Sequence, residues 1–286
     1  MINSRNILFV ILTLAAIVMI YEPMAALLSN RMLSDYYSHI ALIPIVSAYL
    51  IASNRREIFA RCEYRLTGAL ISLLGMAGYW WGRTLEGDLS LNDHTSLLTF
   101  AALVFWVGGF FWIYGRNALR SALFPLVFLI FMVPIPEEIM NRIIYILQVG
   151  STEVTYLFFN LIGIPVAREG FIFHLPGVSI EVAKQCSGIR SSLGLFITGV
   201  LACHFFLKSN LSKGILLAAI YPLTIFKNGV RIVTLTLLAI YVDEGFLTGG
   251  FLHRSGGFVF YIPALAIMGV ILMGLRRGER NKLKGS

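Results

Sequence analysis

Three residues that lie far apart in the sequence could act together as a nucleophile, a cation and an acid–base group. They are Cys186, Arg231 and His253. A cysteine thiolate attacks carbonyl carbon, a guanidinium stabilises a developing oxyanion, and an imidazole moves protons near neutral pH. Meeting at one boundary of a membrane, they would supply the chemistry of a cysteine transpeptidase or protease.

Cys186 lies in a polar segment, residues 182–190, that opens directly into an apolar run. Polar residues flank the thiol at Lys184, Gln185, Ser187 and Arg190, so Ser187 and Arg190 are supporting candidates. A helix N-terminus and nearby cations both favour thiolate over thiol. A cysteine in a membrane protein is otherwise a small apolar filler, and the polar neighbours argue against that role here.

Arg231 lies inside a long apolar run, with Asn228 one helical turn earlier on the same face. Counted from Lys213 at the predicted cytoplasmic surface, Arg231 is about 27 Å along the helix, nearly the thickness of the hydrocarbon core. The guanidinium could instead extend to the lipid headgroups (snorkelling), which is the alternative to a functional role in a polar site. Because charges buried in membranes are usually paired and functional, Asn228 and Arg231 predict a polar site near the outer interface.

His253 immediately precedes the last apolar run, in a predicted outer loop. A lone histidine in a loop is more often solvated than catalytic. His253 is a catalytic candidate because the predicted topology puts it at the same membrane boundary as Cys186. His39 begins the second predicted span on the same side. It could line the same cavity, although contact with headgroups fits equally well.

The composition excludes an ordinary soluble domain. Hydrophobic residues make up 57% of the chain, charged residues 13%, and the mean hydropathy is +0.78. Several runs reach the roughly 18 to 20 apolar residues that a bilayer requires. The sequence therefore predicts an all-α polytopic membrane protein, with the first apolar run retained because it lacks a small-residue cleavage site.

About eight transmembrane helices are predicted, with both termini in the cytoplasm. In that layout the inside segments hold most of the 23 basic residues, and acidic residues gather in the outside segments. The basic residues that give the net charge of +8 then serve to orient the helices in the membrane, and no nucleic-acid partner is predicted. The predicted spans are residues 7–28, 39–53, 66–85, 96–114, 119–133, 187–207, 211–241 and 257–275.

Residues 134–186 form an insertion predicted to stay on the extracytoplasmic side. Residues 139–162 carry one hydrophilic helical stripe, which fits a helix in the interface or one that lines a polar cavity. The interfacial helix is favoured, since a ninth span here would move Cys186 to the cytoplasm. Two β-prone runs around Pro176-Gly177 predict a short hairpin that leads the chain to Cys186. The stripe consists of Asn141, Gln148, Thr152 and Thr155.

No cofactor and no metal site are predicted, because zinc-binding spacings, phosphate loops and dinucleotide fingerprints are missing from the sequence. The three cysteines are odd in number and widely spaced, so no disulfide framework is expected. Cys203 is assigned to packing and Cys62 to a cytoplasmic basic loop. A single membrane domain is expected over residues 1–278, followed by a polar cytoplasmic tail at 279–286 whose end is disordered.

The chain resembles the exosortase/archaeosortase family of polytopic membrane cysteine transpeptidases. The likeness covers most of the chain, and the cysteine block with a downstream Asn-x-x-Arg and a histidine is highly specific in combination. It is carried by Asp35-Tyr36-Tyr37-Ser38-His39, Val133-Pro134-Ile135-Pro136, Leu147-Gln148, Gly163-Ile164-Pro165-Val166, Gly170, Val182-Ala183-Lys184-Gln185-Cys186-Ser187-Gly188-Ile189-Arg190, Lys227-Asn228-Gly229-Val230-Arg231-Ile232 and His253.

The resemblance implies a catalytic set of Cys186, Arg231 and His253 that cleaves sorting signals. The cysteine is expected to form a thioester, which an acceptor in the cell envelope or water then resolves. The resemblance also implies partners that are exported proteins with a C-terminal Pro-Glu-Pro-like (PEP-CTERM) motif, one transmembrane helix and a basic end. Such systems accompany exopolysaccharide production. The archaeal branch often departs at the histidine position, so His253 indicates a bacterial exosortase in the inner membrane, with its active site at the periplasmic face and in contact with lipid.

Two other classes of function are weighed against this enzyme. A non-catalytic transporter or flippase would use Arg231 and His253 in a polar path, and matching broken helices in two halves would support it. A scaffold for exopolysaccharide assembly would use the Cys186 segment for packing alone. Only the enzyme would form a thioester that hydroxylamine cleaves.

Overall fold

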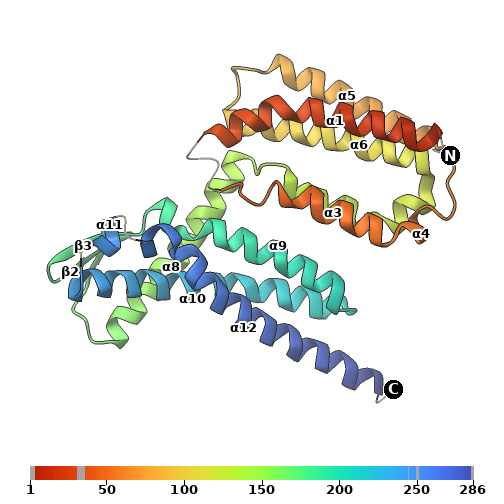
Figure 1. The fold of residues 1–286 in the computed structure, drawn as a ribbon. Helices are drawn as coiled ribbons and strands as arrows, with labels where there is room; N and C mark the ends of the chain where they lie inside the picture. The colour runs from red at the N-terminus through yellow and green to blue at the C-terminus, as the bar shows by residue number, and fades with distance from the viewer. Residues whose placement is uncertain (1–3, 31–35, 244, 249–250, 285–286) are drawn as a thin grey trace. The chain divides into compact units, whose positions relative to one another are not determined.

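The computed structural model describes residues 4–30, 36–243, 245–248 and 251–284 (Figure 1). The description leaves out the side chains of residues 185–186, 247–248, 251–258 and 283–284. The described residues are mainly helical with one small sheet, which confirms the predicted all-α class. They divide into two compact units, Met1–Ile139 (unit 1) and Met140–Ser286 (unit 2), each treated by itself below. A single domain over residues 1–278 stays a prediction.

Unit 1 is a helical bundle built along α6 (Leu91–Ser121), against which α1 (Ser4–Ser29) and α5 (Leu66–Thr84) pack (Figure 1). The Ser90 hydroxyl caps α6 by accepting a hydrogen bond from the Asp93 N–H. Gly115 (φ 82°) interrupts the helical geometry of α6 one residue after the predicted span end at 114. The other elements are α3 (Leu42–Ser53), α4 (Arg55–Ile58), α7 (Leu123–Phe128) and the 3₁₀ helix η1 (Leu129–Met132).

Glycines let α5 and α6 approach each other closely. A Cβ atom added at Gly68 would lie 2.2 Å from the backbone nitrogen of Trp112, and one at Gly75 would lie 2.3 Å from that of Phe105. Between these contacts, the Ser72 hydroxyl donates a hydrogen bond to the Phe105 carbonyl at 2.9 Å. Small residues at a helix interface are typical of helix packing within lipid.

Unit 2 combines a three-helix core with a small sheet. Its helices are α8 (Glu137–Leu161, which begins in unit 1), α9 (Ile189–Phe206), α10 (Asn210–Tyr241), α11 (Gly245–Thr248) and α12 (Phe251–Lys284). Helices α9, α10 and α12 pack on one another (Figure 1). Their shared core is apolar and includes Leu195, Cys203, Leu216, Ile220, Leu223 and Met268. Cys203 is therefore a packing residue, as the sequence predicts.

The predicted hairpin is confirmed and belongs to a three-stranded antiparallel sheet. Strands β1 (Ala167–Glu169), β2 (Ile172–Leu175) and β3 (Val178–Glu181) follow one another in order. Pro176 and Gly177 form the two-residue connection between β2 and β3, and Gly177 takes φ 84°. Proline fixes its own φ and glycine tolerates positive φ, so this turn was readable from the sequence.

Five helices in the described residues are long and apolar enough to cross a membrane, and a sixth crossing results if one bent pair is a single span. That pair joins Leu123–Met132 to Glu137–Leu161 at 86°. The predicted count of eight is not confirmed, because the second predicted span folds as the 12-residue α3 and the fifth is divided among α6, α7 and η1. A 12-residue helix is only about 18 Å long. Helix α12 continues to Lys284, so the predicted disorder at the C-terminal end is wrong up to that residue.

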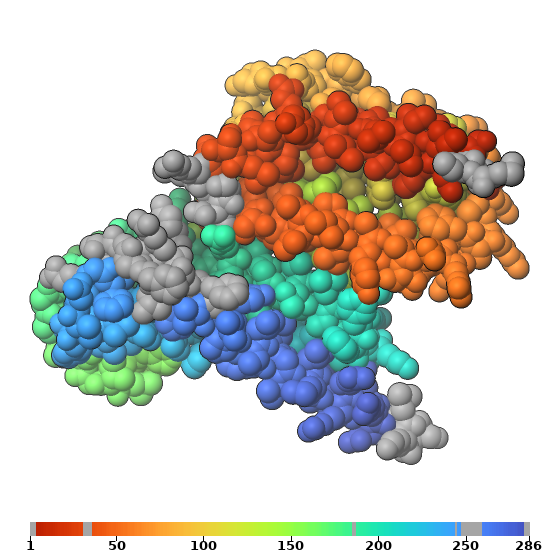
Figure 2. All heavy atoms as spheres, viewed as in Figure 1, coloured from red at the N-terminus to blue at the C-terminus, as the bar shows by residue number. Residues whose placement is uncertain are grey.

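The outer faces of several helices are apolar. Along α1, Val10, Leu14, Val18 and Tyr21 are 55 to 74% exposed. Figure 2 shows the red atoms of α1 uncovered along the helix in this view. Exposed apolar rows on long hydrophobic helices are expected where lipid takes the place of water.

Candidate active site

The Cys186 backbone lies in a short 3₁₀ turn, η2 (Lys184–Ser187), between the sheet and α9. Gly188 follows with φ 77°, and α9 begins at Ile189, two residues later than the sequence predicts. Only glycine takes this left-handed conformation without strain. The turn leads the chain from strand β3 into α9, with Cys186 two residues before Gly188.

Hydrogen bonds hold this turn at both ends. The Gln148 side-chain amide of α8 donates to the Val182 carbonyl at 2.5 Å. At the other end, the hydroxyls of Ser191 and Ser192 donate to the Gly188 carbonyl at 3.0 and 2.7 Å. The segment that carries Cys186 is therefore fixed from two different helices, α8 and α9.

The turn lies directly against α10. A Cβ atom added at Gly188 would lie 3.0 Å from Oδ1 of Asn228, whose side chain is fully buried. The Asn228 amide also donates to the Ser151 hydroxyl of α8 at 3.0 Å. Asn228 thus connects the cysteine turn, α8 and α10, so the structure brings together the two motifs that the sequence analysis treated separately.

Arg231 lies one turn beyond Asn228 on α10 and is half-buried. Ser187, next to Cys186, is fully buried, and its hydroxyl has no hydrogen-bond partner among the described residues. Arg190 is the second residue of α9 and is exposed. Ser187 and Arg190 thus lie at the start of α9, beside the part of α10 that carries Asn228 and Arg231. Both parts lie beyond the core that α9, α10 and α12 share.

Lys227 belongs to this polar region and was missed as a site residue. Its side chain is only 5% exposed, and its ammonium donates to the Ser191 hydroxyl. One signal in the sequence could have found it, because Lys227 precedes Arg231 by four residues and two cations so spaced share a helix face. The choice of Ser191 as its partner, on another helix, could not be read from the sequence.

The polar stripe predicted for residues 139–162 faces the interior of the protein. Gln148, Thr152 and Thr155 are buried, as is Ser151 between them, whereas Asn141 is exposed. Apolar residues occupy the outward face of α8, where Tyr145, Ile146 and Leu157 are 50 to 59% exposed, as are several of their neighbours. Helix α8 thus carries its polar side inward and its apolar side outward. This arrangement fits both a helix in the membrane interface and a helix that lines a polar cavity, the two alternatives that the sequence left open.

His253 is the third residue of α12 and not part of a loop. The loop was predicted because His253 immediately precedes the last apolar run, whereas helix α12 begins two residues before His253. The side chains of Cys186 and His253 lie outside the described residues. Their convergence with Arg231 stays a prediction.

His39 lies in unit 1, in the turn before α3. Burial lowers the pKa of His39, while hydrogen bonds with the backbone of Phe131 and Tyr36 oppose this shift. Its neighbour Tyr37 donates to Asn92 Oδ1 at 2.5 Å, and burial is the main cause that raises the pKa of Tyr37 to about 12.

The Val133-Pro134-Ile135-Pro136 segment is anchored to the start of α6. The Asn92 amide donates to the Ile135 carbonyl at 2.8 Å, and the Ser96 hydroxyl donates to the Pro134 carbonyl at 2.7 Å. Since proline lacks an N–H, side chains from α6 supply the bonds that hold this segment in place.

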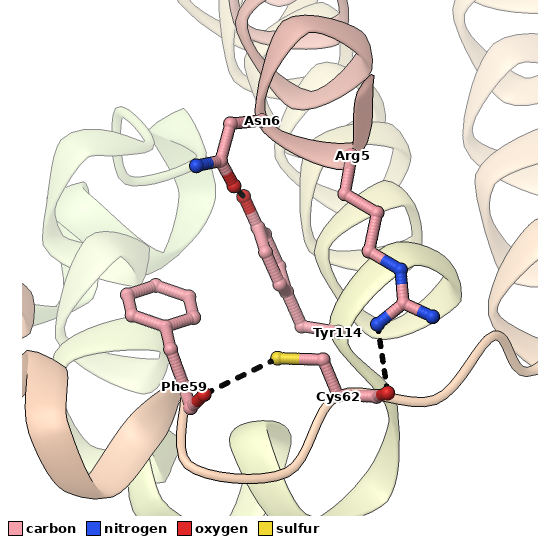
Figure 3. Close-up of a pocket in the computed structure, with 5 residues that line it drawn as sticks. All are labelled: Arg5, Asn6, Phe59, Cys62 and Tyr114. Carbon is pink, nitrogen blue, oxygen red and sulfur yellow. Dashed lines mark hydrogen bonds between the residues drawn. The ribbon is translucent and has the colours of Figure 1, made fainter. Parts of the chain in front are cut away.

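A hollow of about 380 Å³ lies in unit 1, between the start of α1, the chain after α4, and α6 (Figure 3). Its polar groups bond to one another: Arg5 donates to the Cys62 carbonyl at 2.7 Å, and Tyr114 donates to Asn6 Oδ1 at 3.2 Å. The Cys62 thiol donates weakly to the Phe59 carbonyl at 3.6 Å. These bonds tie the first turn of α1 to the bundle, which indicates a structural role.

The described residues contain no group of three or more His, Cys, Asp or Glu side chains that could hold a metal ion. The α9–α10 site offers a cysteine on a fixed turn, buried amide and hydroxyl groups, and cations.

Comparison with known proteins gives one family. The family model described as transmembrane exosortase matches residues 29–270, which reach across both units and include every candidate residue named above. No curated protein and no solved structure matches the chain.

Proposed function

The chain belongs to the transmembrane exosortase family, and on that premise we propose that it is a membrane-embedded cysteine transpeptidase with Cys186 as its nucleophile. Family membership supports a role in the sorting or processing of exported proteins at the membrane. The finer assignment of reaction, substrate and residues is the proposal.

One observation supports it above the others: the cysteine turn and the Asn-x-x-Arg helix are in contact. Gly188, two residues after Cys186, lies against Asn228, and Arg231 follows on the next turn of α10. Packing alone does not require a fully buried asparagine at a glycine in the left-handed conformation, since an apolar side chain fills space without a polar atom to satisfy.

The proposed reaction begins when the Cys186 thiolate attacks the scissile carbonyl carbon. A carbon–sulfur bond forms and the carbonyl oxygen becomes an oxyanion, which the guanidinium of Arg231 stabilises. When the intermediate collapses, the carbon–nitrogen bond breaks and His253 gives a proton to the leaving amine. An acceptor nucleophile or water then attacks the thioester carbonyl and releases the thiol.

The proposed substrates are exported proteins that end in a short motif, one transmembrane helix and a basic segment, of the Pro-Glu-Pro type that the resemblance implies. The proposed site of action is the periplasmic face of a bacterial inner membrane. By the positive-inside rule, the basic end of the substrate stays in the cytoplasm. The scissile bond would then lie at the other end of the substrate's transmembrane helix, just outside the hydrocarbon core on the periplasmic side.

Replacement of the thiol tests the proposal. Cys186→Ala should abolish cleavage of a co-expressed substrate that carries a cognate sorting signal, measured by the change in its mobility and by mass spectrometry of the new end. In the unchanged protein, rapid denaturation should trap a substrate adduct that hydroxylamine releases.

Cys203→Ala is the matched control. Cys203 lies on α9 in the apolar core, about 21 Å along the helix from its first residue, Ile189. This variant should process the substrate at a rate close to that of the parent. Continued processing by Cys186→Ala would refute the assignment of the nucleophile.

A further inference from the structure

Lys227 is a buried cation that the proposed reaction leaves without a role. It lies on α10, one turn before Arg231, and only 5% of its surface is exposed. Among the described residues its ammonium has one hydrogen bond, to the Ser191 hydroxyl, whereas an ammonium can donate three. A buried charge is stable only with partners that compensate the loss of water.

No carboxylate among the described residues pairs with Lys227. On its own helix the nearby charge is Arg231, which repels it. Helix α9 contributes Arg190, which is exposed. Helix α8 contributes Glu153, whose carboxylate is 60% exposed and pairs with Arg168 at 2.8 Å. The polar end of the α9–α10 pair thus carries an excess of positive charge.

Two hydrogen bonds connect Lys227 with the cysteine turn. The ammonium donates to the Ser191 hydroxyl, and that hydroxyl donates to the Gly188 carbonyl at 3.0 Å. With its oxygen lone pair engaged by the ammonium, the Ser191 hydroxyl is oriented toward Gly188. The lysine therefore fixes a hydrogen-bond donor at Gly188, the left-handed residue two positions after Cys186.

Resting on the function proposed above, we propose that Lys227 is a positioning residue that holds the Cys186 turn through Ser191 and whose buried charge favours the thiolate form of Cys186. The anion that compensates this lysine is then produced by the site itself, as the thiolate. A cation in a buried setting acts on a nearby anion far more strongly than one in water.

The test measures the reactivity of Cys186 in the full-length protein in membranes, with no substrate present. Because the chain has only three cysteines, Cys62→Ser and Cys203→Ala leave Cys186 as the sole thiol. Its rate of alkylation by iodoacetamide is followed by mass spectrometry from pH 5 to pH 9, and processing of a cognate substrate is measured in parallel.

Lys227→Met removes the charge and keeps much of the volume. It should slow alkylation at pH 7 by about threefold to tenfold and raise the pH of half-maximal alkylation by about half to one unit, since one unit is a tenfold change in ionisation. Lys227→Arg keeps the charge and should keep that pH. Lys213→Met, the same substitution on the same helix but far from the turn, should change neither quantity.

Ser191→Ala tests positioning with a smaller change. It removes the hydroxyl between Lys227 and Gly188, so it should slow processing several-fold and raise the half-maximal pH by less than Lys227→Met does. This variant also decides the matter if Lys227→Met does not accumulate.

An unchanged pH profile in Lys227→Met, or an unchanged profile and processing rate in Ser191→Ala, would overturn the proposal. These outcomes are separate from a failure of the proposed function, because alkylation of Cys186 needs no substrate. If Cys186→Ala still processed the substrate, the transpeptidase assignment would fall while the effect of Lys227 on the thiol remained measurable.

Discussion

Gly188→Ala should damage the site more than it damages the fold. Gly188 has φ 77°, and an alanine Cβ there would lie 3.0 Å from Oδ1 and 3.2 Å from Cγ of Asn228. The left-handed conformation is unfavourable for alanine by about 1–2 kcal/mol. The contact with Asn228 is also tighter than ordinary van der Waals distance, so the cysteine turn and α10 must separate by a few tenths of an ångström.

Gly163→Ala is the matched control for this strain. Gly163 has φ 74°, and no atom lies within 4 Å of an added Cβ atom among the described residues. Both variants should lose about 1–2 kcal/mol, which lowers a midpoint of thermal unfolding by about 2–8 °C in a chain of this size. Only Gly188→Ala also moves the turn that carries Cys186.

The assay compares the two variants in membranes, at a temperature well below both unfolding midpoints. Gly188→Ala should process substrate about tenfold more slowly or worse, because small displacements of a reacting group have large effects on rate. Gly163→Ala should stay close to the parent. Equal processing by both variants would show that the contact between the turn and Asn228 does not position the nucleophile.

Three further predictions concern single contacts. Gln148→Leu leaves the buried Val182 carbonyl without its donor, so it should lower stability by about 1–3 kcal/mol and slow alkylation of Cys186. Gly75→Ala would put a Cβ 2.3 Å from the α6 backbone and should sharply reduce the yield of folded protein, whereas Gly78→Ala on the same helix has its nearest atom at 3.8 Å and should not. Since burial lowers the pKa of His39 below its ordinary value of 6.5, folding disfavours its protonated form. Stability should therefore fall as pH decreases from about 6.5 through the lower folded-state pKa, and His39→Gln should weaken that dependence in thermal unfolding measured at pH 5 and pH 7.5.

Local signals made part of this fold predictable. The Pro176-Gly177 turn, the long apolar runs of α9, α10 and α12, and the polar stripe of α8 are all set by residues close together in sequence. The number of spans was less predictable, because the break after α6 depends on Gly115 and on how the following segments pack. The loop expected around His253 is a helix, because the end of an apolar run does not mark the end of a helix.

The candidate site was also predictable only in part. A cluster of polar groups beside an apolar run is visible in the sequence, and two of the residues expected to support the cysteine, Ser187 and Asn228, are buried at its turn. The partners that fix the turn were not visible. Gln148 to Val182, and Lys227 to Ser191, join residues 34 and 36 positions apart, and no periodicity within one helix encodes which residue of another helix will lie opposite.

The two ends of the α9–α10 pair should respond to substitution in opposite ways. At the apolar end, Leu216 is fully buried in the shared core, so Leu216→Ala should cost about 2–5 kcal/mol of stability by creating a cavity. At the polar end, a buried ammonium with one hydrogen bond and a buried Ser187 hydroxyl without a partner among the described residues are unfavourable for folding. Replacing a buried charge by an apolar side chain of similar volume is often neutral or stabilising. Lys227→Met should therefore leave the thermal midpoint unchanged or raise it while thiol reactivity and processing fall, which is the signature of a group kept for function at the expense of stability.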